Sequence, residues 1–289
     1  MPSHPVIELR DVDITAGSQV LVRRLSVDIA AGRVLTIVSE RADVRAALLR
    51  VLAGDIADYG IGGDLVMEGR ELVSRVGNTT QAEAHVVRVV GPLDGRVRVR
   101  DLAEADLLER VGLDAAAERV GSLGIDDRLR AAYAEAMARG PRVLVVDVPR
   151  MPEAGSLLPV HSDLIHTLAA DGRTTIVVGT DSLAVAADLA DDVLVLLDGH
   201  PMELGSVYDV CMRPATPYVQ DLLRFTASPH RELPDYRGFV DLTARQGCPW
   251  VLNCRAQVVH ACSQVAPALQ AVALGHAGAC HLLGSVADA

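Results

Sequence analysis

The chain has 289 residues, enough for one large domain or two modest ones, and 50% of them are hydrophobic although only 3% are aromatic. Its formal net charge of −11 argues against a surface that follows nucleic-acid phosphates and against direct docking on anionic lipid, because both partners attract clustered positive charge. All of its basic residues other than histidine are arginines, and lysine is absent.

The amino terminus predicts neither secretion nor a membrane anchor. The sequence MPSHPVIELRDVD lacks a charged region followed by an apolar run, so it does not resemble a signal peptide. No uncharged apolar stretch approaches the roughly 20 residues that a membrane-spanning helix needs. We therefore expect a cytoplasmic protein, in which thiols stay reduced and disulfides are not expected.

The predicted elements alternate between strands and helices along the chain. Residues 7–14 and 19–29 alternate apolar and polar side chains, which predicts antiparallel edge strands. Helical spacing is found in Ala/Leu-rich segments such as 45–54 and 128–140. This order predicts an α/β fold with a mainly parallel sheet and helices on both faces. The strands expected to be buried on both faces are the continuously apolar stretches 34–38, 142–148, 174–180 and 192–199.

The composition changes near Pro214. From there to the end, Pro, Cys and His recur and no long helix is evident. We therefore expect one domain over residues 1–213 and a small appended module over residues 214–289.

A series of short stretches along the chain resembles the nucleotide-binding subunits of ATP-binding-cassette importers, in particular the subfamily for dipeptides, oligopeptides and nickel. The resemblance runs over essentially the whole chain and implies an ABC-type P-loop NTPase fold. The stretches are, in order, IELRDVDI, SVDIAAGRVLTIV, GDLVMEGREL, DLLERVGL, ARGPRVLVVDVP, DSLAVAADLADDVLVLLDGHPMELGS, PATPYVQDLL and the cysteine-rich stretch that begins at GCPW.

The phosphate loop of that family is altered in this chain. Such a loop reads Gly-x-x-x-x-Gly-Lys-Ser/Thr, because glycines let backbone amides approach the phosphates, lysine reaches the terminal oxygens and the hydroxyl binds Mg²⁺. Valine does not supply the positive φ of glycine, and the forked arginine is not equivalent to lysine. We expect Arg45 to be a solvent-exposed residue on the first turn of a helix. The residues at the four motif positions, within SERADVRAA, are Ser39, Val44, Arg45 and Ala46.

The other motifs implied by the resemblance are altered as well. Asp147 is retained and could still orient Mg²⁺, but the catalytic glutamate after it is Val148. Loss of a general base typically costs about 10²–10⁴-fold in rate. The switch histidine corresponds to Thr180, and the usual glutamine falls near Val90.

The signature motif, LSGGQ in relatives, is Leu123-Gly124-Ile125-Asp126-Asp127 in this chain. Gly124 stands at the position of the serine, and the two acidic side chains of Asp126 and Asp127 would face the γ-phosphate of a nucleotide held by a partner subunit, where relatives present Ser and Gly amides. No aromatic residue precedes Tyr59, so the adenine-stacking residue is missing too. The segment from Val90 to Leu123 is short, which predicts a reduced helical subdomain. Together these changes predict a pseudo-ATPase.

Four cysteines near the end of the chain match the spacing C-x5-C-x7-C-x17-C of the importer subfamily, in which the four thiolates hold a [4Fe–4S] cluster. Zinc is the alternative, since Cys₄ sites also bind it, although zinc sites usually contain a C-x2–4-C pair that this chain lacks. Cys211 is expected to be a core residue, and ordinary buried thiols are the remaining alternative. The expected ligands are Cys248, Cys254, Cys262 and Cys280.

The leading functional prediction is a non-hydrolysing cassette subunit on the cytoplasmic face of a peptide importer. It would pair with an active ATPase subunit, contact two permease subunits and work indirectly with a substrate-binding protein, and it would bind ATP weakly or through its partner. The alternative is a free-standing iron–sulfur or redox-responsive protein that reuses the fold. A third possibility, an active enzyme with displaced motifs, conflicts with the absence of lysine.

Overall fold

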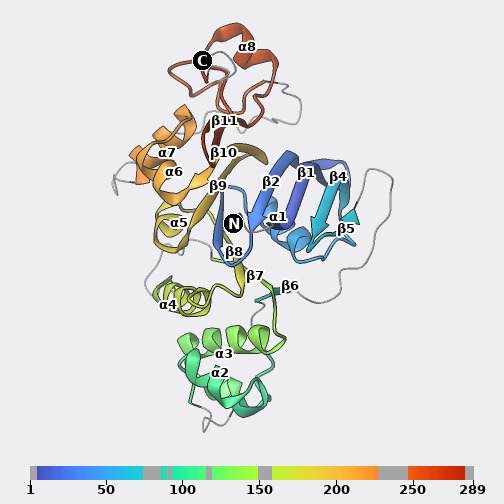
Figure 1. The fold of residues 1–289 in the computed structure, drawn as a ribbon, viewed down its shortest axis with the longest axis vertical. Coiled ribbons are helices and arrows are strands. Elements are labelled where there is room, and N and C mark those ends of the chain that lie inside the picture. The colour runs from blue at the N-terminus through green and yellow to red at the C-terminus, as the bar shows by residue number, and fades with distance from the viewer. Residues whose placement is uncertain are drawn as a thin grey trace.

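A computed structural model describes residues 5–73, 86–89, 93–114, 119–148, 158–226 and 247–283, and its strands form two sheets (Figure 1). The first sheet is antiparallel, with the strand order β2-β1-β4-β5. The strand predictions for residues 7–14 and 19–29 are confirmed, but these strands form their own sheet instead of edging the parallel one. Their bounds are β1 (Pro5–Ala16), β2 (Gln19–Ala30), β4 (Gly60–Met67) and β5 (Arg70–Val73).

The second sheet is larger and has the order β11-β12-β10-β9-β3-β8-β7-β6. Strands β9, β3, β8, β7 and β6 are parallel, and β10, β12 and β11 extend this sheet by antiparallel pairing. The strand bounds are β3 (Val34–Ser39), β6 (Val86–Arg88), β7 (Val143–Asp147), β8 (Thr175–Thr180), β9 (Asp192–Leu197), β10 (His200–Ser206), β11 (Gln270–Ala273) and β12 (His276–Gly278).

Helices cover both faces of the parallel strands, as the sequence predicts. Helix α1 (Ala42–Leu52) shares a buried core with the antiparallel sheet and with β3 and β7. On the opposite face, a second core joins β7 and β8 to α3 (Ile125–Ala138), α4 (Leu158–Ala169) and α5 (Leu183–Leu189). The carboxyl ends of β3, β7 and β8 therefore meet at the amino end of α1.

The segment expected to be a reduced helical subdomain contains short elements only. Between β6 and α3, the described residues form the six-residue helix α2 (Ala105–Arg110) and two single 3₁₀ turns, Val99–Asp101 and Val120–Ser122. Figure 1 shows α2 and α3 together at one end of the molecule, below the two sheets.

The chain beyond Pro214 packs on the domain through a third core. Helices α6 (Val207–Met212) and α7 (Pro217–Thr226) lie there with Trp250, whose ring is 5.0 Å from that of Tyr218. Helix α7 has ten residues, although no long helix was expected in this part of the sequence. After α8 (Val259–Gln264), the hairpin of β11 and β12 joins the large sheet, because β12 pairs with β10.

One fully buried carboxylate ties this last hairpin to the sheet. Glu203 on β10 accepts hydrogen bonds from the backbone N–H of Ala215, at 2.8 Å, and of Thr216, at 3.0 Å. The Thr216 hydroxyl donates to it as well, at 2.8 Å, and His276 Nε2 on β12 lies 2.9 Å from Oε1. Burying a carboxylate costs free energy unless its oxygens are hydrogen-bonded. The buried carboxylate of Glu203 therefore favours the state in which β12 and the segment before α7 are both packed on β10.

Candidate functional site: a filled phosphate loop and a cysteine pocket

The loop that corresponds to a phosphate loop lies where β3 ends and α1 begins. Ser39 ends β3 and is fully buried, Val44 is fully buried, and Ala46 is exposed. In a nucleotide-binding loop, backbone N–H groups at this point of the fold face the phosphates, and the helix dipole favours negative charge. Here the charged side chains of the loop bind partners within the chain.

Arg45 is buried, so the expectation of a solvent-exposed side chain is wrong. Only 5% of the residue is accessible. Its Nε donates to Asp147 Oδ1 at the end of β7, at 2.7 Å, and its Nη1 donates to the carbonyl oxygen of Ser39, at 3.2 Å. Asp147, which could orient a metal ion in an active relative, is therefore paired with a guanidinium.

A second ion-pair group surrounds the amino end of α1. Arg41 donates through Nε and Nη2 to the two carboxylate oxygens of Asp43, at 3.0 and 2.5 Å, and through Nη1 to Asp198 in the turn after β9. Asp43 also accepts the N–H of Val44, at 2.9 Å. The Arg41 guanidinium holds the pKa of Asp43 below its usual range. The anion at this helix end is thus one of the chain's own carboxylates.

Glu40 is the third charged side chain of this loop, and the sequence reasoning assigned it no role. Its Oε1 accepts the backbone N–H of Asp198, at 2.7 Å, while Oε2 is buried with no hydrogen-bond partner among the described residues. Burial, and then the nearby Asp198 carboxylate, raise the pKa of Glu40 to about 7. The signal that could have indicated this cluster is the density of charge in ERADVR, directly after β3, whose other residues besides Thr36 and Ser39 are apolar.

The remaining positions that the family resemblance assigns to catalysis carry side chains that do not transfer protons at neutral pH. Val148 is buried and its N–H donates to the carbonyl of Gly179, at 2.7 Å. Thr180 is fully buried, and its hydroxyl accepts the N–H of Ser182, at 3.2 Å. Val90 lies outside the described residues.

The residues that the family resemblance matches to the signature motif lie at the amino end of α3. Gly124 is the residue before the helix, Ile125 is 68% exposed, and Asp126 and Asp127 are in the first turn. Carboxylates in a first helical turn interact favourably with the helix dipole, so these two aspartates neutralise the end of the helix that would otherwise attract a phosphate.

The structure brings the four predicted cysteine ligands to one small pocket. Its volume is about 20 Å³, and Trp250 and Tyr218 also line it. Burial is the main reason why the pKa of Cys248 is raised to about 11, and the other three thiols raise it further. As placed, no three His, Cys, Asp or Glu side chains of the described segments lie close enough together to hold a metal ion. The four cysteines that line the pocket are Cys248, Cys254, Cys262 and Cys280.

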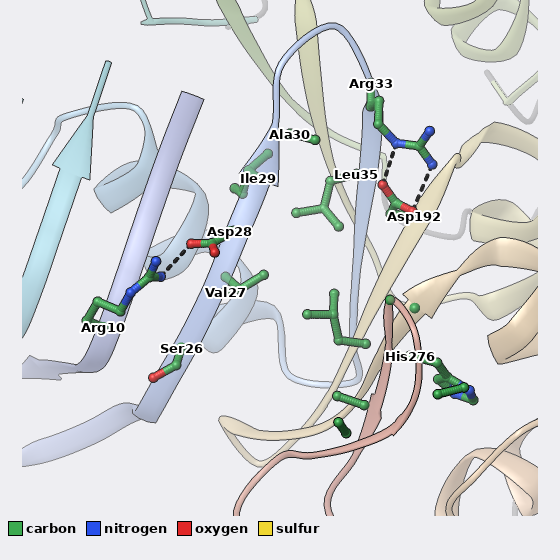
Figure 2. Close-up of a pocket in the computed structure, with 16 residues that line it drawn as sticks. Arg10, Ser26, Val27, Asp28, Ile29, Ala30, Arg33, Leu35, Asp192 and His276 are labelled. Atoms are coloured by element: carbon green, nitrogen blue, oxygen red, sulfur yellow. Dashed lines mark hydrogen bonds and ion pairs between the residues drawn. The ribbon is translucent and has the colours of Figure 1, made fainter. Parts of the chain in front are cut away.

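A larger cavity of about 550 Å³ opens between β2 and the hairpin of β11 and β12 (Figure 2). Its charged side chains are already paired with each other: Arg10 contacts Asp28, and Arg33 forms a two-point ion pair with Asp192, at 2.6 and 2.9 Å. Arg33 precedes the first residue of β3, whereas the phosphate-loop position follows its last residue. At about 3.3 Å per residue, the two sites lie at opposite ends of this six-residue strand.

Comparison with known proteins supports the fold. No protein-family model matches the sequence. The chain is 26% identical over 317 residues to the oligopeptide transport ATP-binding protein OppD of Salmonella typhimurium, which covers 96% of this chain and 94% of that protein. It is 28% identical over 248 residues to the methionine import ATP-binding protein MetN of Brucella abortus, covering 77% of this chain and 65% of the relative.

Solved structures give the same result. A nucleotide-free ATP-binding cassette from an ABC transporter matches with a TM-score of 0.61 at 14% identity, over 75% of this chain and 98% of that one. The cbiO1 subunit of Clostridium perfringens, part of the ABC transporter complex cbiONQ, matches with a TM-score of 0.59 at 15% identity, over 73% of this chain and 92% of that one. The chain therefore has the ABC ATPase fold, and in sequence it is related to ATP-binding subunits of importers. No helix in the described part of the chain is long and apolar enough to cross a membrane.

Proposed function

We propose that this chain is a non-hydrolysing cassette subunit of a peptide importer, which pairs with an active ATPase subunit and docks on the permeases at the cytoplasmic face of the membrane. The observation that carries the proposal is the ion pair of Arg45 with Asp147, 2.7 Å long, at the point where a cassette would bind a metal–phosphate group. A guanidinium on Asp147 Oδ1 competes with a metal ion for this carboxylate.

The chemistry of hydrolysis also lacks its base. In an ATPase a carboxylate positions and deprotonates the attacking water. The residue after Asp147 is Val148, whose buried aliphatic side chain can do neither. ATP turnover in the complex would then come from the partner subunit, and this chain would contribute binding surface and structure.

The choice of a peptide as the transported substrate rests on two features. The relative that covers almost the whole chain is named an oligopeptide transport protein, and the spacing of the last four cysteines resembles that of the same subfamily. Other relatives are named methionine or sulfate/thiosulfate import proteins, so methionine and sulfate are the alternative substrate classes.

The test of this function has two measurements. Tagged chain expressed in its own cells should co-purify with permease subunits and a second cassette subunit that has intact motifs. The isolated chain should show no micromolar binding of Mg-ATP by calorimetry, and Val148→Glu alone should give no ATP turnover. A chain that purifies alone, without permeases, would favour the free-standing iron–sulfur protein, and tight Mg-ATP binding would show that the phosphate loop has been placed wrongly.

We also propose that the cysteine pocket holds a [4Fe–4S] cluster. The residue types suit this group, because four thiolates are its usual ligands and the four cysteines line one pocket although they span residues 248 to 280. No three of these side chains lie close enough together in the described segments to share a metal ion, so binding would have to draw the thiols together. When bound, the cluster would supply folding energy by joining α8 and the loops around it. The aromatic side chains of Trp250 and Tyr218 also line the pocket and belong to the third core.

The cluster proposal is tested by purification without oxygen. The protein should be brown, absorb broadly near about 400 nm and contain about four irons per chain. Cys254→Ser should bleach the colour and make the chain beyond α7 sensitive to protease. Cys211→Ser is the matched control, because Cys211 lies on α6 and is only partly buried in the third core, and it should do neither. One zinc per colourless chain would replace the cluster by a structural zinc site, and metal-free protein would leave four buried thiols.

A further inference from the structure

The path of the Arg45 side chain joins four elements at the carboxyl edge of the sheet. From α1 it reaches Asp147 on β7 and the Ser39 carbonyl on β3. Its stem lies against β8, since a Cβ added to Gly179 would be 2.9 Å from the Arg45 Cγ. Because Gly179 has no side chain, the Arg45 side chain has space to pass over β8 at this position.

The charged groups around this path are paired with one another inside the chain. The Asp43 carboxylate lies at the amino end of α1 and accepts the N–H of Val44, where a nucleotide-binding loop would present N–H groups to a phosphate. The Arg45 guanidinium lies on Asp147, where a metal ion would carry the positive charge. The bridge from Arg41 to Asp43 and Asp198 fixes the loop to the turn after β9.

We propose that this loop is a built-in substitute for a bound metal–phosphate group: Asp43 takes the place of the anion and Arg45 that of the cation, so that α1, β3, β7 and β8 keep one arrangement without a ligand. The inference rests on the proposed function and goes further, because an empty degenerate site would be loose, whereas this one is cross-linked. The subunit then presents the same surface to its partner whatever the nucleotide concentration.

The physical reason is the position of the ion pair. The Arg45 side chain is 6% exposed and that of Asp147 is 42% exposed, so the guanidinium is largely removed from water and depends on its two acceptors. A nucleotide would have to displace the Asp43 carboxylate, and Mg²⁺ would have to displace a guanidinium that is hydrogen-bonded twice. Both halves of a metal–nucleotide complex are therefore excluded by groups that are already in place.

The experiment is chemical rescue of a truncated arginine, read as the thermal midpoint Tm of the full-length chain. Arg45→Ala removes the atoms beyond Cβ, which ethylguanidinium can replace. We expect this variant to lose about 4–8 °C in Tm, because Asp147 loses its partner and the stem leaves a cavity. Millimolar ethylguanidinium should restore at least half of the loss, since a ligand that binds only the folded state raises its stability.

Three controls decide the outcome. Ethylammonium, which has the charge without the fork, should rescue less. Arg45→Ala combined with Asp147→Asn should not respond to ethylguanidinium, and neither should Arg50→Ala, because Arg50 on the same helix pairs with the exposed carboxylates of Asp55 and Asp58. Wild-type Tm should not change with Mg-ATP.

The inference is overturned if Arg45→Ala keeps the wild-type Tm, or if ethylguanidinium affects the single and double variants equally. Neither result bears on co-purification with permeases, so the proposed function would survive this failure. A rise of the wild-type Tm with Mg-ATP would instead contradict both, because the site would then accept a nucleotide.

Discussion

Replacing Glu203 with leucine is expected to lower the free energy of unfolding by about 4 kcal/mol or more and to release the last hairpin from the sheet. Glu203 is fully buried and accepts four hydrogen bonds, from the N–H groups of Ala215 and Thr216, the hydroxyl of Thr216 and the ring of His276. Leucine leaves these donors buried without an acceptor, and each such group costs about 1–3 kcal/mol.

The readout for Glu203→Leu is urea unfolding together with amide hydrogen exchange of β11 and β12. Exchange in this hairpin should speed up more than in β3 or β8, because the lost contacts lie between β10, β12 and the residues before α7. Glu135→Ala is the matched control: its carboxylate forms an i,i+4 ion pair with Arg139 at the surface of α3, and such pairs contribute less than about 1 kcal/mol. Equal stability of the two variants would show that Glu203 does not hold the hairpin.

Much of the fold could be predicted from the sequence because its strongest signals are local. The apolar runs ending at Val38, Val146 and Val178 predict strands buried on both faces, and these are the parallel centre of the large sheet. The separation of the first strands into a second sheet is not local. It depends on α1, which packs between the two sheets, and no strand pattern indicates that position.

The candidate site was predicted less completely, for the same reason. The altered motif positions can be read from spacing, but the burial of Arg45 depends on Asp147, which is 102 residues away in the sequence and adjacent only through the β3–β8–β7 pairing. The pairing of Glu203 with His276, 73 residues apart, is also a product of sheet order. The spacing of the cysteines led to the prediction of a cluster site; the four cysteines line one pocket, and their role as ligands stays a prediction.

Stability should fall as pH rises from about 4.5 to about 7, because of Glu40. Burial holds the pKa of this carboxyl at about 7, above its value of 4.5 in an unfolded chain, so the folded protein keeps the proton in this interval while the unfolded chain releases it. Because the pKa of Glu40 is higher in the folded state, protonation of this carboxyl favours folding. This contribution to the free energy of unfolding is present in full below about pH 4.5 and is lost once the pH exceeds the folded-state pKa of about 7. The size of the effect is at most about 3.5 kcal/mol, since the pKa rises from 4.5 to about 7 and one pKa unit corresponds to about 1.4 kcal/mol.

Glu40→Gln should remove this pH dependence. The glutamine amide is neutral at every pH. It retains an oxygen that can accept the N–H of Asp198, which in the wild-type chain lies 2.7 Å from Glu40 Oε1. The variant should match the wild type near pH 5 and exceed it by about 2 kcal/mol at pH 8, measured by urea unfolding at both pH values. Glu109→Gln, at an exposed position of α2, should leave the pH profile unchanged. If Glu40→Gln keeps the wild-type slope between pH 5 and 8, the Glu40 carboxyl is ionised in the folded protein, and its buried Oε2 must then have acquired a donor.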